Sequence, residues 1–116
     1  MNYKGSCHCG LVSYEVDVEP GPVLECNCSI CSRKGTLLWF TPRTKLNMLT
    51  GEDALTVYTF GTHNVRHHFC HVCGCTTFGI GKPPGAKEET AAINVRCLEG
   101  VDQENLERRQ FDGRSL

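Results

Sequence analysis

Cys26-Asn27-Cys28-Ser29-Ile30-Cys31 places three thiols within six residues, at C-x-C-x-x-C spacing. A segment this tight can fold back on itself and direct all three sulfurs at one cation. Two shorter clusters flank it, Cys7-His8-Cys9 before it and Cys70-His71-Val72-Cys73 after it. The three clusters contribute two, three and two thiols, so seven thiols lie at spacings that suit a metal.

The number of thiols predicts two different zinc sites. Structural zinc takes four tetrahedral ligands, so seven thiols divide into one closed four-sulfur site and one three-sulfur site with a vacant position. Cys7, Cys9, Cys70 and Cys73 together would tie the N-terminal strand to a distant hairpin, and closing so long a loop removes chain entropy. Arithmetic does not fix this pairing, because Cys7 and Cys9 can equally join the other cluster.

Length and charge limit the class of protein. A chain of 116 residues predicts a single domain, residues 1–116, whose core is sufficient but not generous, so a metal would add stability. The formal net charge is −1, and acids and bases are interspersed. This distribution predicts binding to neither nucleic acid nor an anionic membrane.

The nine cysteines favour metal binding over disulfides. Met1-Asn2-Tyr3-Lys4 does not read as a secretory leader, and the longest strongly apolar run, residues 37–40, is too short to span a bilayer. Cysteines one or two residues apart make poor disulfides and good metal ligands. We therefore expect a reducing, cytoplasmic setting.

The remaining pattern is that of an all-β domain with two sheets. Val12, Tyr14, Val16 and Val18 alternate with polar residues, as in a half-buried strand. Ser29 is a candidate cap for a short helical turn that Gly35 ends. Helical composition is convincing only over 102–109, and the last residues read as a solvated tail. The segments with strand character are 11–18, 36–41, 46–49, 54–60, 65–70, 75–80 and 90–97.

The cluster Cys26, Cys28 and Cys31 has no fourth ligand nearby in sequence. Zinc on three thiolates carries a single negative charge, which Arg33 and Lys34 could offset. The fourth position would then hold water or a substrate thiol. The alternative is a closed site completed by another side chain, and the candidates for it are His8, His67, His68, His71, Cys75 and Cys97.

Several of these candidates also have simpler interpretations. Cys75 and Cys97 are expected as small buried strand residues, with a metal or redox role as the alternative. Cys97 belongs with Ala91, Ile93 and Val95 on the apolar face of its segment. His67 and His68 point to opposite faces of one strand, so at most one can reach a given site.

At its cysteine clusters the chain resembles the glutathione-dependent formaldehyde-activating (GFA) family, which includes centromere protein V-like proteins. The segments that carry the resemblance contain all seven thiols in the family's order and cover nearly the whole chain. They are Gly5-Ser6-Cys7-His8-Cys9-Gly10 with Val12-Ser13-Tyr14-Glu15-Val16, Cys26-Asn27-Cys28-Ser29-Ile30-Cys31-Ser32-Arg33, and Phe69-Cys70-His71-Val72-Cys73-Gly74.

The resemblance implies a β-tent fold, two sheets pinned by zinc, shared with methionine-R-sulfoxide reductases. It implies two zinc ions per chain, a structural one and a catalytic one. The structural zinc would be held by Cys7, Cys9, Cys70 and Cys73, and the catalytic zinc by Cys26, Cys28 and Cys31. The implied activity is that of a carbon–sulfur lyase, or its reverse, which joins formaldehyde and glutathione to S-hydroxymethylglutathione. The chain departs from the founding enzyme in lacking extra segments that would contact glutathione.

The sequence therefore predicts a zinc-dependent lyase acting on a thiol–aldehyde adduct. A substrate thiol would be the fourth ligand of the open zinc, and Arg33 or Lys34 would hold the substrate carboxylates. One alternative is a non-catalytic zinc module that binds a protein or carries metal. Another is a sulfoxide-reductase-type enzyme with Cys97 as nucleophile, disfavoured because that family builds its zinc site from two C-x-x-C pairs.

Overall fold

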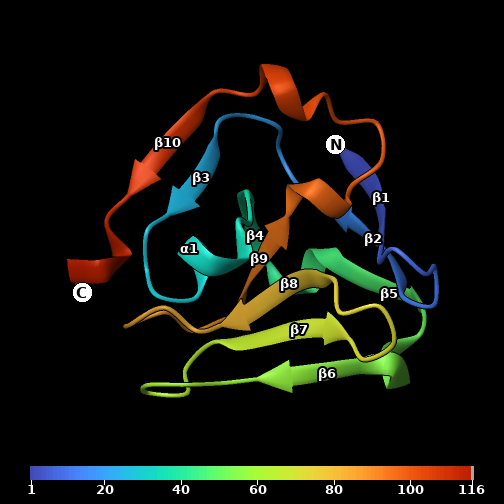
Figure 1. Cartoon of the computed structure of the whole chain (residues 1–116), viewed down its shortest axis with the longest axis horizontal. Coiled ribbons are helices and arrows are strands. Elements are labelled where there is room, and N and C mark those ends of the chain that lie inside the picture. Colours follow the sequence, from blue (N-terminus) through green and yellow to red (C-terminus); the bar gives the residue numbers. More distant parts are fainter. Residues whose placement is uncertain (116) are drawn as a thin grey trace.

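The computed structural model describes residues 1–115, which form two β-sheets joined by short turns (Figure 1). The predicted all-β, two-sheet fold is confirmed, and its cysteine clusters lie where they can pin zinc. The smaller sheet is antiparallel with the order β1-β2-β5. Its strands are β1 (Asn2–Ser6), β2 (Ser13–Asp17) and β5 (Leu46–Thr50).

The larger sheet has seven strands in the order β10-β3-β4-β9-β8-β7-β6. Every neighbouring pair is antiparallel except β10 and β3, which run parallel along the edge seen at the left of Figure 1. The strands are β3 (Val23–Cys26), β4 (Leu38–Pro42), β6 (Leu55–Tyr58), β7 (Arg66–Cys70), β8 (Thr76–Gly81), β9 (Thr90–Asn94) and β10 (Arg108–Phe111).

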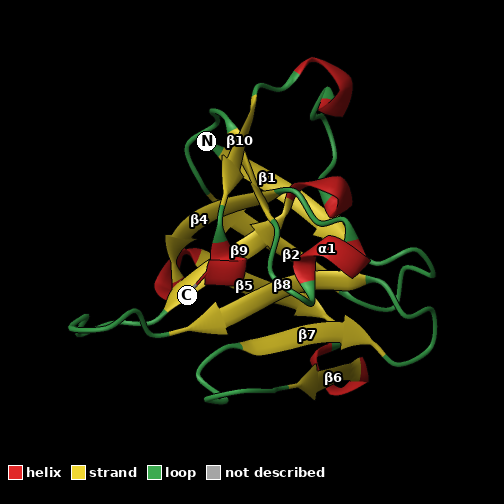
Figure 2. Cartoon of the chain, turned by 60° about the vertical axis from the view of Figure 1, so that its left-hand side comes forward, coloured by secondary structure: helices red, strands yellow, loops and turns green. Residues whose placement is uncertain are grey.

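Helical segments are short, and all but the one that follows β10 lie between strands (Figure 2). The α-helix α1 (Cys31–Lys34) is one turn long and ends where Gly35 adopts φ +69° and its N–H donates to the Cys31 carbonyl. No helix of residues 1–115 has the length and apolar character needed to cross a bilayer. The 3₁₀ turns are η1 (Arg43–Lys45), η2 (Glu52–Ala54), η3 (Val95–Cys97), η4 (Gln103–Asn105) and η5 (Gly113–Ser115).

Two helical predictions were wrong. Ser29 does not cap α1, because Ile30 occupies the cap position in a helical conformation; the Ser29 carbonyl instead accepts a hydrogen bond from Arg33 Nη1 at 2.7 Å. Residues 102–109 form only η4 before β10 begins. This segment lacks the apolar stripe that would anchor a helix, whereas pairing with β3 gives its backbone hydrogen-bond partners.

Three strands are more than one residue shorter than predicted: β2, β6 and β9, the last with a clear physical cause. β9 ends at Asn94, whose side chain accepts a hydrogen bond from the Arg96 N–H and starts η3. Cys97 is therefore half-buried in a turn and does not lie on the apolar face of a strand. Ala91, Ile93 and Val95 are fully buried, as predicted.

The core lies between the two sheets. Val12, Tyr14 and Val16 are each 0% exposed, which confirms the predicted alternation. The Tyr14 ring packs edge-on against Phe78 of β8, with centroids 5.3 Å apart. Burial of such apolar area is the main stabilising term in a domain of this size.

Gly51 provides a test of how closely the loops pack. A Cβ at Gly51 would overlap the Leu11 carbonyl oxygen, and φ is +76°. Gly85 has a similar φ of +79° but open space around it. We expect Gly85→Ala to cost about 1 kcal/mol from backbone strain and Gly51→Ala about 1–3 kcal/mol more from the overlap. Equal urea unfolding midpoints for the two variants would contradict the close approach.

Candidate metal and substrate site

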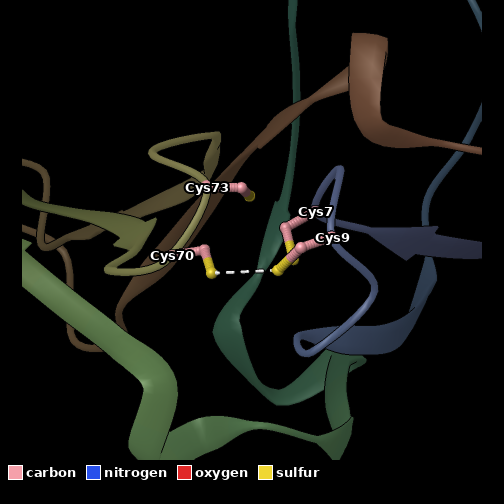
Figure 3. A group of neighbouring side chains, drawn as sticks. All are labelled: Cys7, Cys9, Cys70 and Cys73. Atoms are coloured by element: carbon pink, nitrogen blue, oxygen red, sulfur yellow. Dashed lines mark hydrogen bonds between the residues drawn. The ribbon is translucent and has the colours of Figure 1, made fainter.

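Four thiols from two distant turns lie together in one group (Figure 3). The sulfurs of Cys7, Cys9, Cys70 and Cys73 all lie within 4.8 Å of one another. Cys7 Sγ is 3.6 Å from Cys9 Sγ, which is 3.7 Å from Cys70 Sγ. The pairing of clusters that the sequence left open is thus settled in space: the first cluster joins the third.

Each turn is shaped by a glycine in the left-handed region. Gly10 has φ +84° and donates its N–H to the Cys7 carbonyl at 3.3 Å. Gly74 has φ +79° and donates to the Cys70 carbonyl at 2.8 Å. These bonds fold each segment back sharply enough for both of its thiols to face the other turn.

The four sulfurs strongly influence one another's ionisation. Backbone hydrogen bonds from Cys75 and Cys9 lower the pKa of Cys73 to about 5. The pKa of Cys9 is raised to about 12: the Leu11 N–H lowers it, but loss of solvation and hydrogen bonds with the neighbouring thiols outweigh that effect. Anionic sulfurs this close repel one another. A dication among them would remove that conflict, so the group can hold a metal ion.

The second group consists of Cys26, Cys28 and Cys31, whose sulfurs also lie within 4.8 Å of one another. All three residues are half-buried. The Cys28 N–H donates to Cys26 Sγ and the Cys31 N–H donates to Cys28 Sγ, each at 3.5 Å. Burial and the neighbouring Cys28 raise the pKa of Cys31 to about 12. The group has the same conflict of charges and can also hold a metal ion.

No fourth cysteine, histidine or carboxylate of residues 1–115 joins this second group. None of the six closing ligands considered from the sequence does so. They were His8, His67, His68, His71, Cys75 and Cys97. The seven clustered thiols thus form one group of four and one group of three, the uneven division that the sequence suggested.

The C-terminal segment holds the three-thiol loop in place, which the sequence did not reveal. Asn27 donates through Nδ2 to Asp112 Oδ1 at 2.9 Å and accepts the Arg114 N–H on Oδ1, also at 2.9 Å. The Asn27 N–H donates to the Phe111 carbonyl. Residues 111–115 are largely exposed, as predicted for a solvated tail, but their hydrogen bonds to Asn27 fix them to the loop.

A cavity of about 340 Å³ opens beside the three thiols. Lys34 lies on its wall, and partial burial lowers the pKa of the Lys34 ammonium, while nearby Cys31 raises it. Arg33 does not line this cavity; its guanidinium donates to the Ser29 carbonyl and faces a separate hollow beside Tyr58. Of the two predicted substrate-binding cations, the structure therefore places only Lys34 at the cavity.

The two adjacent histidines of β7 face opposite sides, as predicted. His67 lines the cavity beside the thiols, and His68 lines a hollow on the other face. Burial, assisted by the charge of Lys34, lowers the pKa of His67, so its imidazole is neutral at pH 7. Its ring stacks on Phe60, with centroids 5.7 Å apart.

The two remaining cysteines lie outside both groups within the described part of the chain. Burial raises the pKa of Cys97 to about 11, and its Sγ donates to the Thr76 carbonyl at 3.4 Å. A nucleophilic cysteine needs a lowered pKa, so this environment argues against the sulfoxide-reductase alternative. The pKa of half-buried Cys75 is also raised, since burial and nearby Cys73 outweigh a backbone hydrogen bond from His8.

The seven clustered thiols lie within a region that known sequences share. Residues 2–111 match the model of the family described as "Glutathione-dependent formaldehyde-activating enzyme". The chain belongs to this family. The resemblance read from the GFA-type cysteine clusters is thereby confirmed, and the family is one of formaldehyde-activating enzymes associated with glutathione.

A solved structure shares the GFA-type fold of this chain. It is a crystal structure of a Rhodobacter sphaeroides protein, with 34% sequence identity and a TM-score of 0.78. The match covers 91% of this chain and 99% of that one.

The close approach of Gly113 to Cys26 predicts that a substitution at Gly113 affects metal binding by the three-thiol group and not by the four-thiol group. A Cβ at Gly113 would lie 2.5 Å from Cys26 Sγ. Gly113→Ala should displace this sulfur and weaken metal binding there by about tenfold or more, about 1.4 kcal/mol, without affecting the four-thiol group. Gly21→Ala is the matched control, since nothing lies within 4 Å of a Cβ at Gly21. Chelator competition measures both sites, and an unchanged affinity in Gly113→Ala would refute the contact.

Proposed function

We propose that this protein is a zinc-dependent carbon–sulfur lyase that acts on a thiol–aldehyde adduct, of which S-hydroxymethylglutathione is the representative for its family. The observation that carries the proposal is a group of three thiols with no fourth protein ligand among residues 1–115, opening onto a cavity. A closed site would suit a purely structural ion, whereas an open position leaves room for a substrate.

The donor sets fit zinc. A zinc–sulfur bond of about 2.3 Å in a tetrahedral site separates sulfurs by about 3.8 Å, and the sulfur pairs Cys7–Cys9 and Cys9–Cys70 are 3.6 and 3.7 Å apart. We assign Cys7, Cys9, Cys70 and Cys73 to a structural zinc and Cys26, Cys28 and Cys31 to a second, open zinc. Zinc bound at the open site would keep a substrate thiol ionised near neutral pH, where a free thiol with a pKa of about 8.5 is mostly protonated.

The residues of the cavity supply binding and proton transfer. In the cleavage direction the C–S bond breaks, its electron pair leaves with sulfur, and the adduct's hydroxyl loses its proton as the aldehyde forms. The neutral imidazole of His67 can accept that proton and return it in the reverse reaction. The Lys34 ammonium can bind a substrate carboxylate.

The cellular setting follows from the same thiols. All nine cysteines are free in the structure, and clusters of reduced thiols are typical of proteins in a reducing compartment. We place the protein, with residues 1–116 as one domain, in the cytoplasm.

Metal content separates the two assigned sites. Cys7→Ser should unfold or insolubilise the protein, because it opens the tie between the two turns. Cys31→Ser should keep the fold and bind one zinc equivalent fewer. Cys97→Ser is the control, since Cys97 is a half-buried cysteine outside both groups, and it should keep both equivalents. Elemental analysis measures the zinc content of each variant, and thermal melting measures its stability. Two zinc equivalents in Cys31→Ser would overturn the ligand assignment.

The reaction itself can be followed by exchange NMR of glutathione and formaldehyde. With zinc-loaded protein the exchange should accelerate by about 10²-fold, the lower range of what a positioned acid or base contributes. His67→Gln should lose most of this acceleration, while His68→Gln, on the opposite face, should retain it. An exchange rate no faster than that without protein, for glutathione and for an apolar thiol such as phenylmethanethiol, would rule out the lyase and favour a binding or metal-carrying module.

A further inference from the structure

The cavity beside the three thiols has an aromatic wall built from three separate elements. Phe40 comes from β4, Phe60 from the connection between β6 and β7, and Phe111 from β10. Their side chains are 51%, 39% and 41% exposed, respectively. Large apolar groups gathered at an opening and left in water favour an apolar ligand.

This wall is held in place before any ligand binds. The Phe60 ring stacks between Tyr58 and His67, with centroid distances of 5.9 and 5.7 Å. Phe111 is fixed by its backbone, whose carbonyl accepts the Asn27 N–H at 3.1 Å. A preformed apolar surface loses little entropy when it binds a ligand.

The cavity offers little to a charged ligand. Apart from the thiols and neutral His67, Lys34 is the one ionisable side chain on the part of its wall that the structure describes, and no carboxylate lines it. Burying a charge without a partner is costly. Lys34 can therefore pair with one anionic group of a ligand, and no carboxylate on the wall can pair with a cationic one.

Glutathione fits these groups poorly. It carries two carboxylates and one ammonium at neutral pH, and Lys34 can pair with only one of the three. The volume of about 340 Å³ is also near the lower end for ligand cavities, which span about 300–1,000 Å³. A compact ligand with an apolar body matches both the walls and the size.

We propose that the adduct bound here has a compact alkyl or aryl body and at most one carboxylate. This inference rests on the proposed function, because the three thiols and their metal would bind the ligand's sulfur. The apolar body would lie against Phe40, Phe60 and Phe111, and a carboxylate, where present, would face Lys34. The site thus prefers an apolar thiol or its aldehyde adduct over the glutathione adduct.

Calorimetry on the zinc-loaded protein tests this preference with four probes. Phenylmethanethiol combines a thiol with an aryl body, 2-mercaptoethanol retains the thiol with a small polar body, and glutathione has the charged body. Benzyl alcohol retains the aryl group without sulfur. We expect phenylmethanethiol to bind at least about tenfold more tightly than each of the others, a difference of about 1.4 kcal/mol.

Substitutions in the aromatic wall test where the apolar body of the ligand binds. Phe40→Ser and Phe60→Ser should each weaken phenylmethanethiol roughly fivefold to tenfold and leave 2-mercaptoethanol unchanged. Both side chains are partly exposed, so the fold should tolerate either change. Leu49→Ser is the matched control: Leu49 is 45% exposed on β5, away from this cavity.

The outcomes separate this inference from the proposed function. Glutathione binding as tightly as phenylmethanethiol would overturn the inference and leave the lyase proposal standing. If benzyl alcohol bound as tightly as phenylmethanethiol, binding of the apolar body at the wall would be supported. The proposal that a metal binds the ligand's sulfur would be overturned. Absence of binding by all four probes would overturn both. Equal losses in Leu49→Ser and Phe60→Ser would overturn the assigned position of the apolar body.

Discussion

The structure depends on four sulfurs brought together from turns whose nearest members, Cys9 and Cys70, are 61 residues apart. One turn joins two strands of the smaller sheet and the other joins two strands of the larger sheet. Backbone hydrogen bonds lower the pKa of Cys73 to about 5, while desolvation and the neighbouring thiols raise that of Cys9 to about 12. A single dication bound by all four sulfurs would tie the two sheets together. Because the tie closes a long loop, its loss would free much chain entropy.

The wall of the cavity depends on the fold in a less direct way. Its aromatic rings come from β4, β10 and the loop before β7, which lie on different parts of the larger sheet. Their convergence requires the sheet to be assembled from end to end. In the proposed function the three thiols would hold the reactive metal, and the sheet would supply the surface that selects the ligand.

Local patterns in the sequence predicted the features that neighbouring residues determine. Alternation at Val12, Tyr14 and Val16 sets one face of β2, and the spacing of Cys26, Cys28 and Cys31 sets the second sulfur group. The pairing of β3 with β10 could not be predicted this way. Arg108–Phe111 has no alternating pattern, and its strand conformation comes from the open edge of β3. Likewise, Lys34 reaches the cavity and Arg33 does not because α1 begins at Cys31, and sequence alone places helix ends with an error of one or two residues.

The hydrogen bonds between Asn27 and residues 111–114 have a consequence for biosynthesis. The three-thiol loop leaves the ribosome early, but the segment that holds it is made more than eighty residues later. Translation proceeds at about 5–20 residues per second, so the nascent loop spends seconds without its support. A cation captured during that interval would sit in an unbraced loop and exchange readily. Secure loading of a cation at this site would therefore wait until residues 111–114 have been made and have docked on the loop.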